Sequence, residues 1–208
     1  MSPTKQKVIE AASFLFFQKG FHGTSVREIA HRASVNVSLI SYYFKSKQGL
    51  LEYAVTGYYE EYLKRLEQTI QQSKSICPIQ KLKKLISVII HYKQNKHQLS
   101  CFIHRELSLD TVFVREMTVT YLAKENHVIR TAFSDALQQA PEQSSHRQFL
   151  FMQFKGMLIT PYIMHHEWRD YVMDDYSHQL FAQRYIETIH HWIDFVMMND
   201  VVEPDRVQ

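Results

Sequence analysis

Apolar residues recur at intervals of three and four along most of the chain, which is the period of an α-helix. The first such stretch predicts a helix from Ser2-Pro3 to Lys19, with Gly20 placed directly after its last turn. No stretch shows the convincing alternation of a β-strand. The 208 residues include only 5 glycines and 5 prolines, as long helices require. The pattern predicts an all-α fold of about nine to ten helices.

Two short helices follow the first, and each begins at a residue suited to cap it. Ser25 and Glu28 have the spacing of a capping box, which predicts the start of the second helix. Asn36 is placed to cap a third helix over residues 37–44, after a tight turn. Two short helices joined by such a turn predict a helix-turn-helix, packed as a three-helix domain.

The remainder of the chain predicts a larger helical body. Its helices are expected over residues 46–72, 78–96, 98–109, 111–139, 144–167 and 174–199. Pro161 lies inside one of them and is expected to kink it. We therefore divide the chain into a DNA-binding head of residues 1–48, a helical dimerisation or regulatory body of residues 49–200, and a tail of residues 201–208.

Charge is distributed unevenly between these parts. The whole chain has 24 lysines and arginines against 21 aspartates and glutamates, which gives a formal net charge of +3. Residues 1–48 contain seven basic and two acidic residues, so the head carries +5 and the rest of the chain −2. A basic head on a weakly acidic body indicates that the head binds a polyanion such as double-stranded DNA.

Other classes of protein are less compatible with the sequence. No apolar run approaches the ~20 residues that cross a bilayer, and the N-terminus lacks the pattern of a signal peptide. Cys77 and Cys101 lack the spacing of a metal site, as do the adjacent histidines at 165–166 and 190–191. No Gly-rich phosphate loop, nucleophile elbow or HExxH motif occurs. We expect a cytoplasmic, nucleoid-associated protein that is not an enzyme and has no catalytic residue, metal or cofactor.

The segment from Thr24 to Leu51 resembles the DNA-binding domain of the TetR family of regulators. That family has a Thr/Ser pair, a helix with Arg-Asp/Glu-Ile-Ala, a turn, an aromatic-rich helix end and a lysine. The corresponding residues here are Thr24-Ser25, Arg27-Glu28-Ile29-Ala30, Tyr42-Tyr43-Phe44 and Lys47. Ser34 departs from the glycine common in the turn, and Ser41 replaces the first aromatic. The resemblance implies a homodimer that binds a palindromic site in double-stranded DNA.

The helix pattern and the resemblance together give a candidate DNA interface. The second helix of a helix-turn-helix can enter the major groove, where its exposed side chains reach the base edges. The residues expected to face the bases are Val37, Ser38, Ser41 and Tyr42. Phosphate contacts are expected from Thr24, Ser25, Tyr43 and Lys47, and Arg27 completes the DNA-binding set.

A narrower resemblance concerns the purpose of binding. The segment NVSLISYYFKSKQGLLE and the Arg-Glu-Leu around position 105 are similar to a division-linked group of TetR-like proteins from spore-forming bacilli, which regulate FtsZ. That similarity implies a role in cell division and sporulation, with FtsZ as a protein partner. The candidate partner surface consists of Arg105, Glu106, Arg115 and Glu116, although solvated helix faces or dimer salt bridges explain these charges equally well.

One alternative keeps DNA binding but changes the signal. A ligand-responsive transcriptional repressor would be released from its operator by a small hydrophobic effector held in the body. The many aromatic and histidine side chains there could line such a pocket, or they could simply fill the core. A large closed cavity would favour the effector, whereas a filled core would favour a protein partner.

Overall fold

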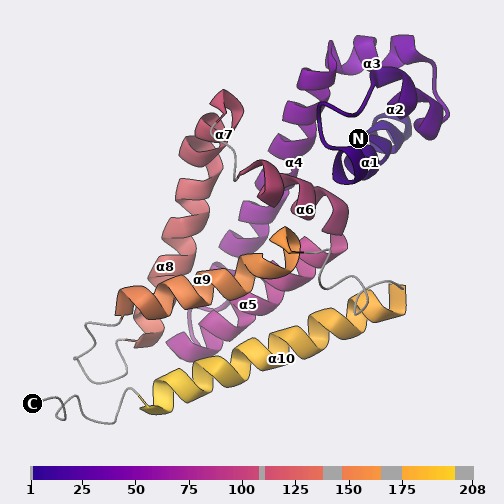
Figure 1. Cartoon of the computed structure of the whole chain (residues 1–208). Coiled ribbons are helices and arrows are strands. Elements are labelled where there is room, and N and C mark those ends of the chain that lie inside the picture. The colour runs from indigo at the N-terminus through magenta and orange to yellow at the C-terminus, as the bar shows by residue number, and fades with distance from the viewer. Residues whose placement is uncertain (1, 108–110, 138–146, 165–174, 200–208) are drawn as a thin grey trace, which may run out of the picture. The chain divides into compact units, whose positions relative to one another are not determined.

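The computed structural model describes residues 2–107, 111–137, 147–164 and 175–199, and they confirm the all-α prediction (Figure 1). These residues form ten α-helices, α1 to α10, and one π-helical segment, η1. The predicted tail at 201–208 and the histidine pair at 165–166 lie outside the described residues.

The chain divides into two compact units. The first unit consists of residues 1–61 and 96–110, and the second of residues 62–95 and 111–208. The first unit therefore contains the predicted head at 1–48 and adds to it the first part of α4 (Lys47–Gln72) and all of α6 (His97–Glu106).

Five helices contribute to the first unit. They are α1 (Pro3–Lys19), α2 (Val26–Ala33), α3 (Val37–Phe44), the start of α4 (Lys47–Gln72) and α6 (His97–Glu106). Helix α1 packs against α2 and α6, and α2 packs against α3. The side chains that hold these helices together are fully buried and apolar, among them Val8, Phe16, Ile29, Ile40, Leu50 and Phe102.

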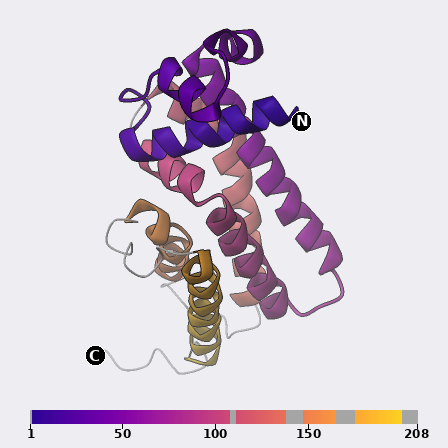
Figure 2. The same ribbon diagram turned by 90° about the vertical axis from the view of Figure 1, so that its right-hand side faces the viewer.

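The second unit is built around α5 (Pro78–Asn95). Its other elements are the end of α4, α7 (Val112–Met117), η1 (Thr118–Leu122), α8 (Ala123–Leu137), α9 (Arg147–Ile163) and α10 (Asp175–Asn199). Helix α5 packs against α8, α9 and α10 (Figure 2). Burial of apolar and aromatic side chains from several helices, such as Leu82, Ile86, Phe133, Phe154 and Ile189, stabilises this arrangement.

The segment predicted as one helix over 111–139 is helical over residues 112–137, but it is not α-helical throughout. It begins as α7, passes through the π-helical segment η1 and continues as α8. A π-helical turn accommodates one extra residue within an otherwise α-helical ladder, and the apolar period on either side of it stays nearly unchanged. The helix predicted over 144–167 is described from Arg147 to Ile163, with Pro161 buried near its end.

A cluster of polar side chains lies inside the second unit. The Lys93 side chain is 3% exposed, and its Nζ atom lies 3.7 Å from Oε1 of Glu125 and donates to the Leu158 carbonyl at 3.3 Å. The Tyr62 hydroxyl donates to the same carboxylate oxygen at 2.8 Å. Burial lowers the pKa of Lys93, and the Glu125 carboxylate opposes that shift. The cluster joins α4, α5, α8 and α9 within this unit.

Candidate nucleic-acid interface

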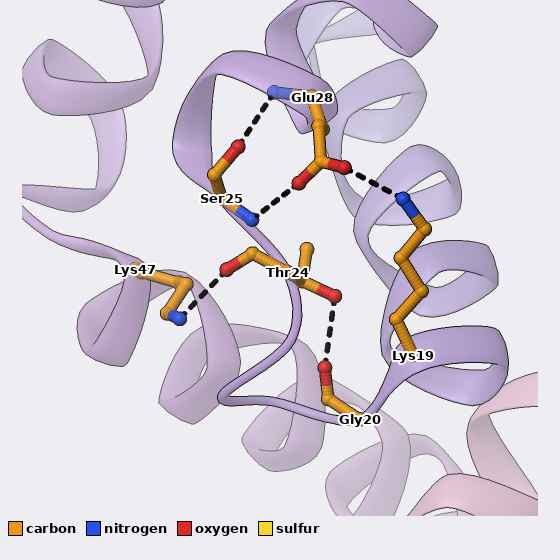
Figure 3. A network of polar contacts seen from close by, with 6 residues as sticks. All are labelled: Lys19, Gly20, Thr24, Ser25, Glu28 and Lys47. Carbon is orange, nitrogen blue, oxygen red and sulfur yellow. Dashed lines mark hydrogen bonds and ion pairs between the residues drawn. The ribbon is translucent and has the colours of Figure 1, made fainter.

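The N-terminus of α2 is held by reciprocal hydrogen bonds, as the sequence predicts. The Glu28 backbone N–H donates to Oγ of Ser25 at 3.2 Å, and the Ser25 N–H donates to Oε2 of Glu28 at 2.8 Å. Figure 3 shows that Lys19 joins this capping box, with Nζ 2.6 Å from Oε1 of Glu28. The hydrogen bond from Lys19, together with those from Ser25, lowers the pKa of Glu28 to about 2. The start of α2 is thereby fixed to the end of α1.

The loop before α2 is fixed by Lys47 from the first turn of α4. Nζ of Lys47 donates to the carbonyls of Thr24 at 2.7 Å and Phe21 at 2.8 Å, and lies 4.4 Å from the centre of the Phe21 ring. The Thr24 side chain points the other way and donates to the Gly20 carbonyl at 2.8 Å (Figure 3). Thr24 is 2% exposed. Thr24 and Lys47, for which the sequence predicts phosphate contacts, therefore both make hydrogen bonds within the protein.

Helix α3 is anchored on one face and capped at its start. Oδ1 of Asn36 accepts from the Ser38 N–H at 2.8 Å and from the Ser38 hydroxyl at 2.7 Å, which confirms Asn36 as the cap. Ile40 is fully buried, and Phe44 is 4% exposed. In the turn before α3, Ser34 adopts a left-handed backbone conformation with φ of 54°, the conformation that glycine adopts most easily.

The opposite face of α3 is open. Tyr42 is 72% exposed and Val37 39%, and Ser38 and Ser41 are also exposed. All four residues assigned to the bases thus lie on accessible parts of one helix, whose two small serines permit a close approach. Arg27 is exposed on the neighbouring α2. We call this surface, which consists of Val37, Ser38, Ser41 and Tyr42, the α3 face.

Tyr43 is half-buried beside the α3 face. Its ring centre lies 5.2 Å from that of Tyr42 in an edge-on arrangement. Nζ of Lys5 lies 5.3 Å from the centre of the Tyr43 ring and 5.4 Å from that of Tyr53. Lys5 is not among the residues predicted from the sequence, because its proximity to Tyr43 is a long-range contact. The concentration of basic residues in the first 48 positions was the one available signal.

The four charged residues assigned to a partner surface are divided between the units. Arg105 lies on α6 in the first unit, where its guanidinium donates to the carbonyls of Phe16 at 2.7 Å and Phe17 at 3.2 Å. It therefore binds the carbonyl end of α1, and Glu106 is half-exposed beside it. Arg115 and Glu116 are exposed on α7 in the second unit.

Membrane spans and metal sites are two other features to consider in the described part of the chain. Its helices include none that is long and apolar enough to span a bilayer. Among the same residues, no three His, Cys, Asp or Glu side chains gather in a way that could hold a metal ion.

Comparison with known proteins gives relatives for the helix-turn-helix and for the whole chain. The sequence model described as bacterial regulatory proteins, tetR family, matches residues 8–54. The "Probable HTH-type transcriptional regulator YttP" of Bacillus subtilis (strain 168) is 37% identical over 190 residues, which cover 91% of this chain and 92% of that protein.

Solved structures share the fold at lower identity. The TetR family transcriptional regulator PfmR from Thermus thermophilus has a TM-score of 0.67 and 16% identity, covering 92% of this chain and 97% of that one. FadR from Bacillus subtilis, solved in complex with stearoyl-CoA, has a TM-score of 0.60 and 19% identity, covering 88% and 96%. These similarities extend over both compact units.

Proposed function

Because the chain belongs to the TetR family of bacterial regulatory proteins, we propose that it is a homodimeric regulator that reads a palindromic site in double-stranded DNA. The observation that carries this proposal is the α3 face. Its residues are exposed, while Ile40 and Phe44 fix the opposite side of the same helix in the core. A helix held in this way can enter the major groove without rearrangement of its own domain.

The proposed division of roles follows from the contacts in the first unit. We assign base contacts to Val37, Ser38, Ser41 and Tyr42. Phosphate contacts belong to Ser25 at the N-terminus of α2, to Arg27 and to Tyr43, because all three retain exposed surface. Thr24 and Lys47 support binding by fixing the loop between α1 and α2.

The second unit offers an apolar surface for the partner protomer. Met152 on α9 is 64% exposed, and Met198 on α10 is 73% exposed. Phe149 and Phe195 on the same two helices also keep more than half of their side chains exposed. Other apolar residues of α9 and α10, such as Phe151 and Ile189, pack inside the protomer. A two-fold dimer would supply two α3 helices, one for each half of a palindromic site.

Selection of bound sequences from a random duplex library tests the proposal. The expected result is an inverted repeat whose half-sites are separated by about one helical turn, or a little more, with affinity that falls steeply as salt rises. Enrichment of no motif, or an affinity independent of salt, would contradict it. Tyr42→Ala protein, carried through the same selection, is expected to enrich the repeat less.

A role in cell division is the finer part of the proposal. The segment from Asn36 to Glu52 and the Arg105-Glu106-Leu107 sequence resemble RefZ, the TetR-like regulator of FtsZ in spore-forming bacilli. On this resemblance we propose FtsZ as a protein partner, contacted through Arg115 and Glu116, which are exposed on α7. Arg105 is less suited to that contact because it is bonded to the end of α1.

Sedimentation of FtsZ polymers with the protein and its DNA site tests this assignment. Wild-type protein is expected to change the amount of polymer, and Arg115→Ala/Glu116→Ala protein is expected to lose the effect while keeping its DNA affinity. Genome-wide mapping is an independent check. Bound sites at fixed chromosomal positions away from promoters support the division role, whereas sites confined to promoters would contradict it.

A ligand-released repressor is the second candidate, because FadR, with the same fold, was solved with stearoyl-CoA. The second unit argues for a smaller effector or none, since Tyr62, Lys93 and Glu125 bind one another in its interior. Titration of stearoyl-CoA into the protein–DNA complex separates the two candidates. Release of DNA at stoichiometric ligand supports the repressor, and unchanged DNA binding supports the division-linked regulator.

A further inference from the structure

A small cleft lies between α8 and α9 in the second unit, remote in sequence from the DNA-binding residues. Its volume is about 100 Å³. Cavities that hold drug-sized ligands measure roughly 300–1,000 Å³, and a cavity of roughly 150 Å³ holds benzene. The cleft is therefore too small for a whole hydrophobic effector, but large enough for one small polar group.

The floor of the cleft is buried and apolar. Phe133, Leu137 and Phe151 line it, and each is at most 6% exposed. The rings of Phe133 and Phe151 pack together with centres 5.5 Å apart. Such a floor excludes water from one side of a bound group, which strengthens electrostatic attraction from the rim.

The rim is polar and carries two positive charges. Arg130 and Ser134 lie one turn apart on α8, and Arg147 and Gln148 form the first turn of α9. The Arg130 guanidinium carbon lies 4.3 Å from the centre of the Phe151 ring, which holds its charge beside the floor. Nε of Arg147 is buried and makes no hydrogen bond to any described residue. Among the described residues, those that line the cleft include no carboxylate.

Two guanidiniums, a hydroxyl and an amide around one small opening provide donors for an oxyanion. A buried guanidinium N–H without an acceptor costs free energy, and an anion that accepts from it removes that cost. These two positive charges lie close together in a part of the chain that is otherwise weakly acidic, because the residues beyond 48 carry a net charge of −2. We propose that Arg130 and Arg147 form an oxyanion site for a phosphate or carboxylate group. This site is separate from the DNA interface and goes beyond the regulator function proposed above.

Titration of the full-length protein with inorganic phosphate, followed by the NMR signal of the Arg147 Nε–H group, tests the site. Potassium chloride at matched ionic strength controls for salt, and sodium acetate provides the carboxylate arm. We expect saturable shifts with phosphate or acetate and none with chloride. Arg130→Gln should weaken the apparent affinity roughly tenfold, since one charge-assisted contact is lost. Arg184→Gln, an exposed arginine on α10 outside the cleft, is the matched control and should titrate as wild type.

A second variant and a measurement of DNA affinity complete the test. Phosphate bound to the folded chain should also raise the melting temperature of wild type, and Arg147→Gln should abolish that rise. Arg130→Gln changes an exposed side chain and remains informative if Arg147→Gln does not fold. Equal shifts with phosphate and chloride, or an unchanged affinity in Arg130→Gln, would overturn the proposal. It would also be overturned if Arg130→Gln lost affinity for duplex DNA, since the arginines would then serve the DNA.

Discussion

Two lysines of the first unit show that a basic side chain in a DNA-binding motif can be committed to the protein itself. Lys19 is bonded to the capping box of α2, and Lys47 to two carbonyls of the preceding loop. Tyr42, in contrast, is largely exposed. The sequence assigned Lys47 and Tyr42 to the same interface, and their surroundings now predict different mutational effects.

Lys47→Met is expected to reduce both the stability of the protein and its DNA affinity. The two hydrogen bonds from a charged donor contribute about 2 kcal/mol, and the loop carrying Thr24 loosens without them. Urea unfolding and fluorescence anisotropy on the same samples measure the two effects. A loss of affinity with unchanged unfolding would indicate that Lys47 contacts phosphate directly, as the family resemblance implies.

Glu28→Gln is expected to change how stability depends on pH. The pKa of Glu28 is lowered from 4.5 to about 2 in the folded chain, so the folded state keeps the ionised form that the unfolded chain loses. The stability contributed by this carboxylate is present above pH 4.5 and disappears as the pH falls toward about 2. The difference in unfolding free energy between wild type and Glu28→Gln should shrink over that interval. A difference that stays constant with pH would refute this role of Glu28. Glu10→Gln on α1 serves as the control variant.

Among the helices, α2 and α3 of the first unit and α5 and α10 of the second could be predicted almost to the residue, whereas the division of the segment 111–139 could not. Ser25, Glu28 and Asn36 mark the starts of α2 and α3 by local chemistry that is visible in the sequence. The π-helical segment η1 has no such marker, because no capping residue specifies it and its extra residue shifts the apolar pattern by only one position.

The candidate site was predictable where it depends on local sequence and not where it depends on long-range contacts. The exposed residues of α3 follow from helical periodicity once Ile40 and Phe44 are assigned to the core. The internal bonding of Lys47 did not follow, because it joins residues 23 and 26 positions apart in the chain. Contacts of this kind depend on packing, which a single sequence does not encode locally.

Met152→Glu on α9 is expected to convert the dimer to a monomer. Met152 is 64% exposed in the single chain, and a carboxylate buried there in a dimer would lack a partner. Light scattering after size-exclusion chromatography should give 24.7 kDa for the variant and twice that for wild type. Val119→Glu on η1, where the side chain is 78% exposed, should remain dimeric. If the Met152→Glu protein remained dimeric, the result would show that this part of α9 does not lie in the dimer interface.

For the molecule as a whole, the packing inside the second unit bears on whether that unit receives an effector or serves as a structural support. Its central polar groups come from four helices and bind one another, so the cluster fixes the packing of the unit. Buried ion pairs contribute little net stability, but removal of one partner leaves a charge without compensation.

Lys93→Met is accordingly expected to destabilise the protein by about 3–5 kcal/mol. Lys93→Met/Glu125→Gln removes both charges and keeps an acceptor for the Tyr62 hydroxyl, so it should recover most of that loss. Urea unfolding of the three proteins provides the comparison. If the double variant were as unstable as the single one, the loss would come from packing rather than from the unpaired carboxylate.

The most direct test of the regulator function is the affinity of Tyr42→Ala protein for the selected duplex, measured by fluorescence anisotropy at one fixed salt concentration. Tyr42 is 72% exposed, so its truncation should leave the fold and the dimer unchanged. Val112→Ala alters an equally exposed residue on α7 and is the control. The account predicts at least a roughly tenfold loss of affinity for Tyr42→Ala and none for Val112→Ala. Equal affinities of wild-type and Tyr42→Ala protein would contradict the assignment of the α3 face to DNA.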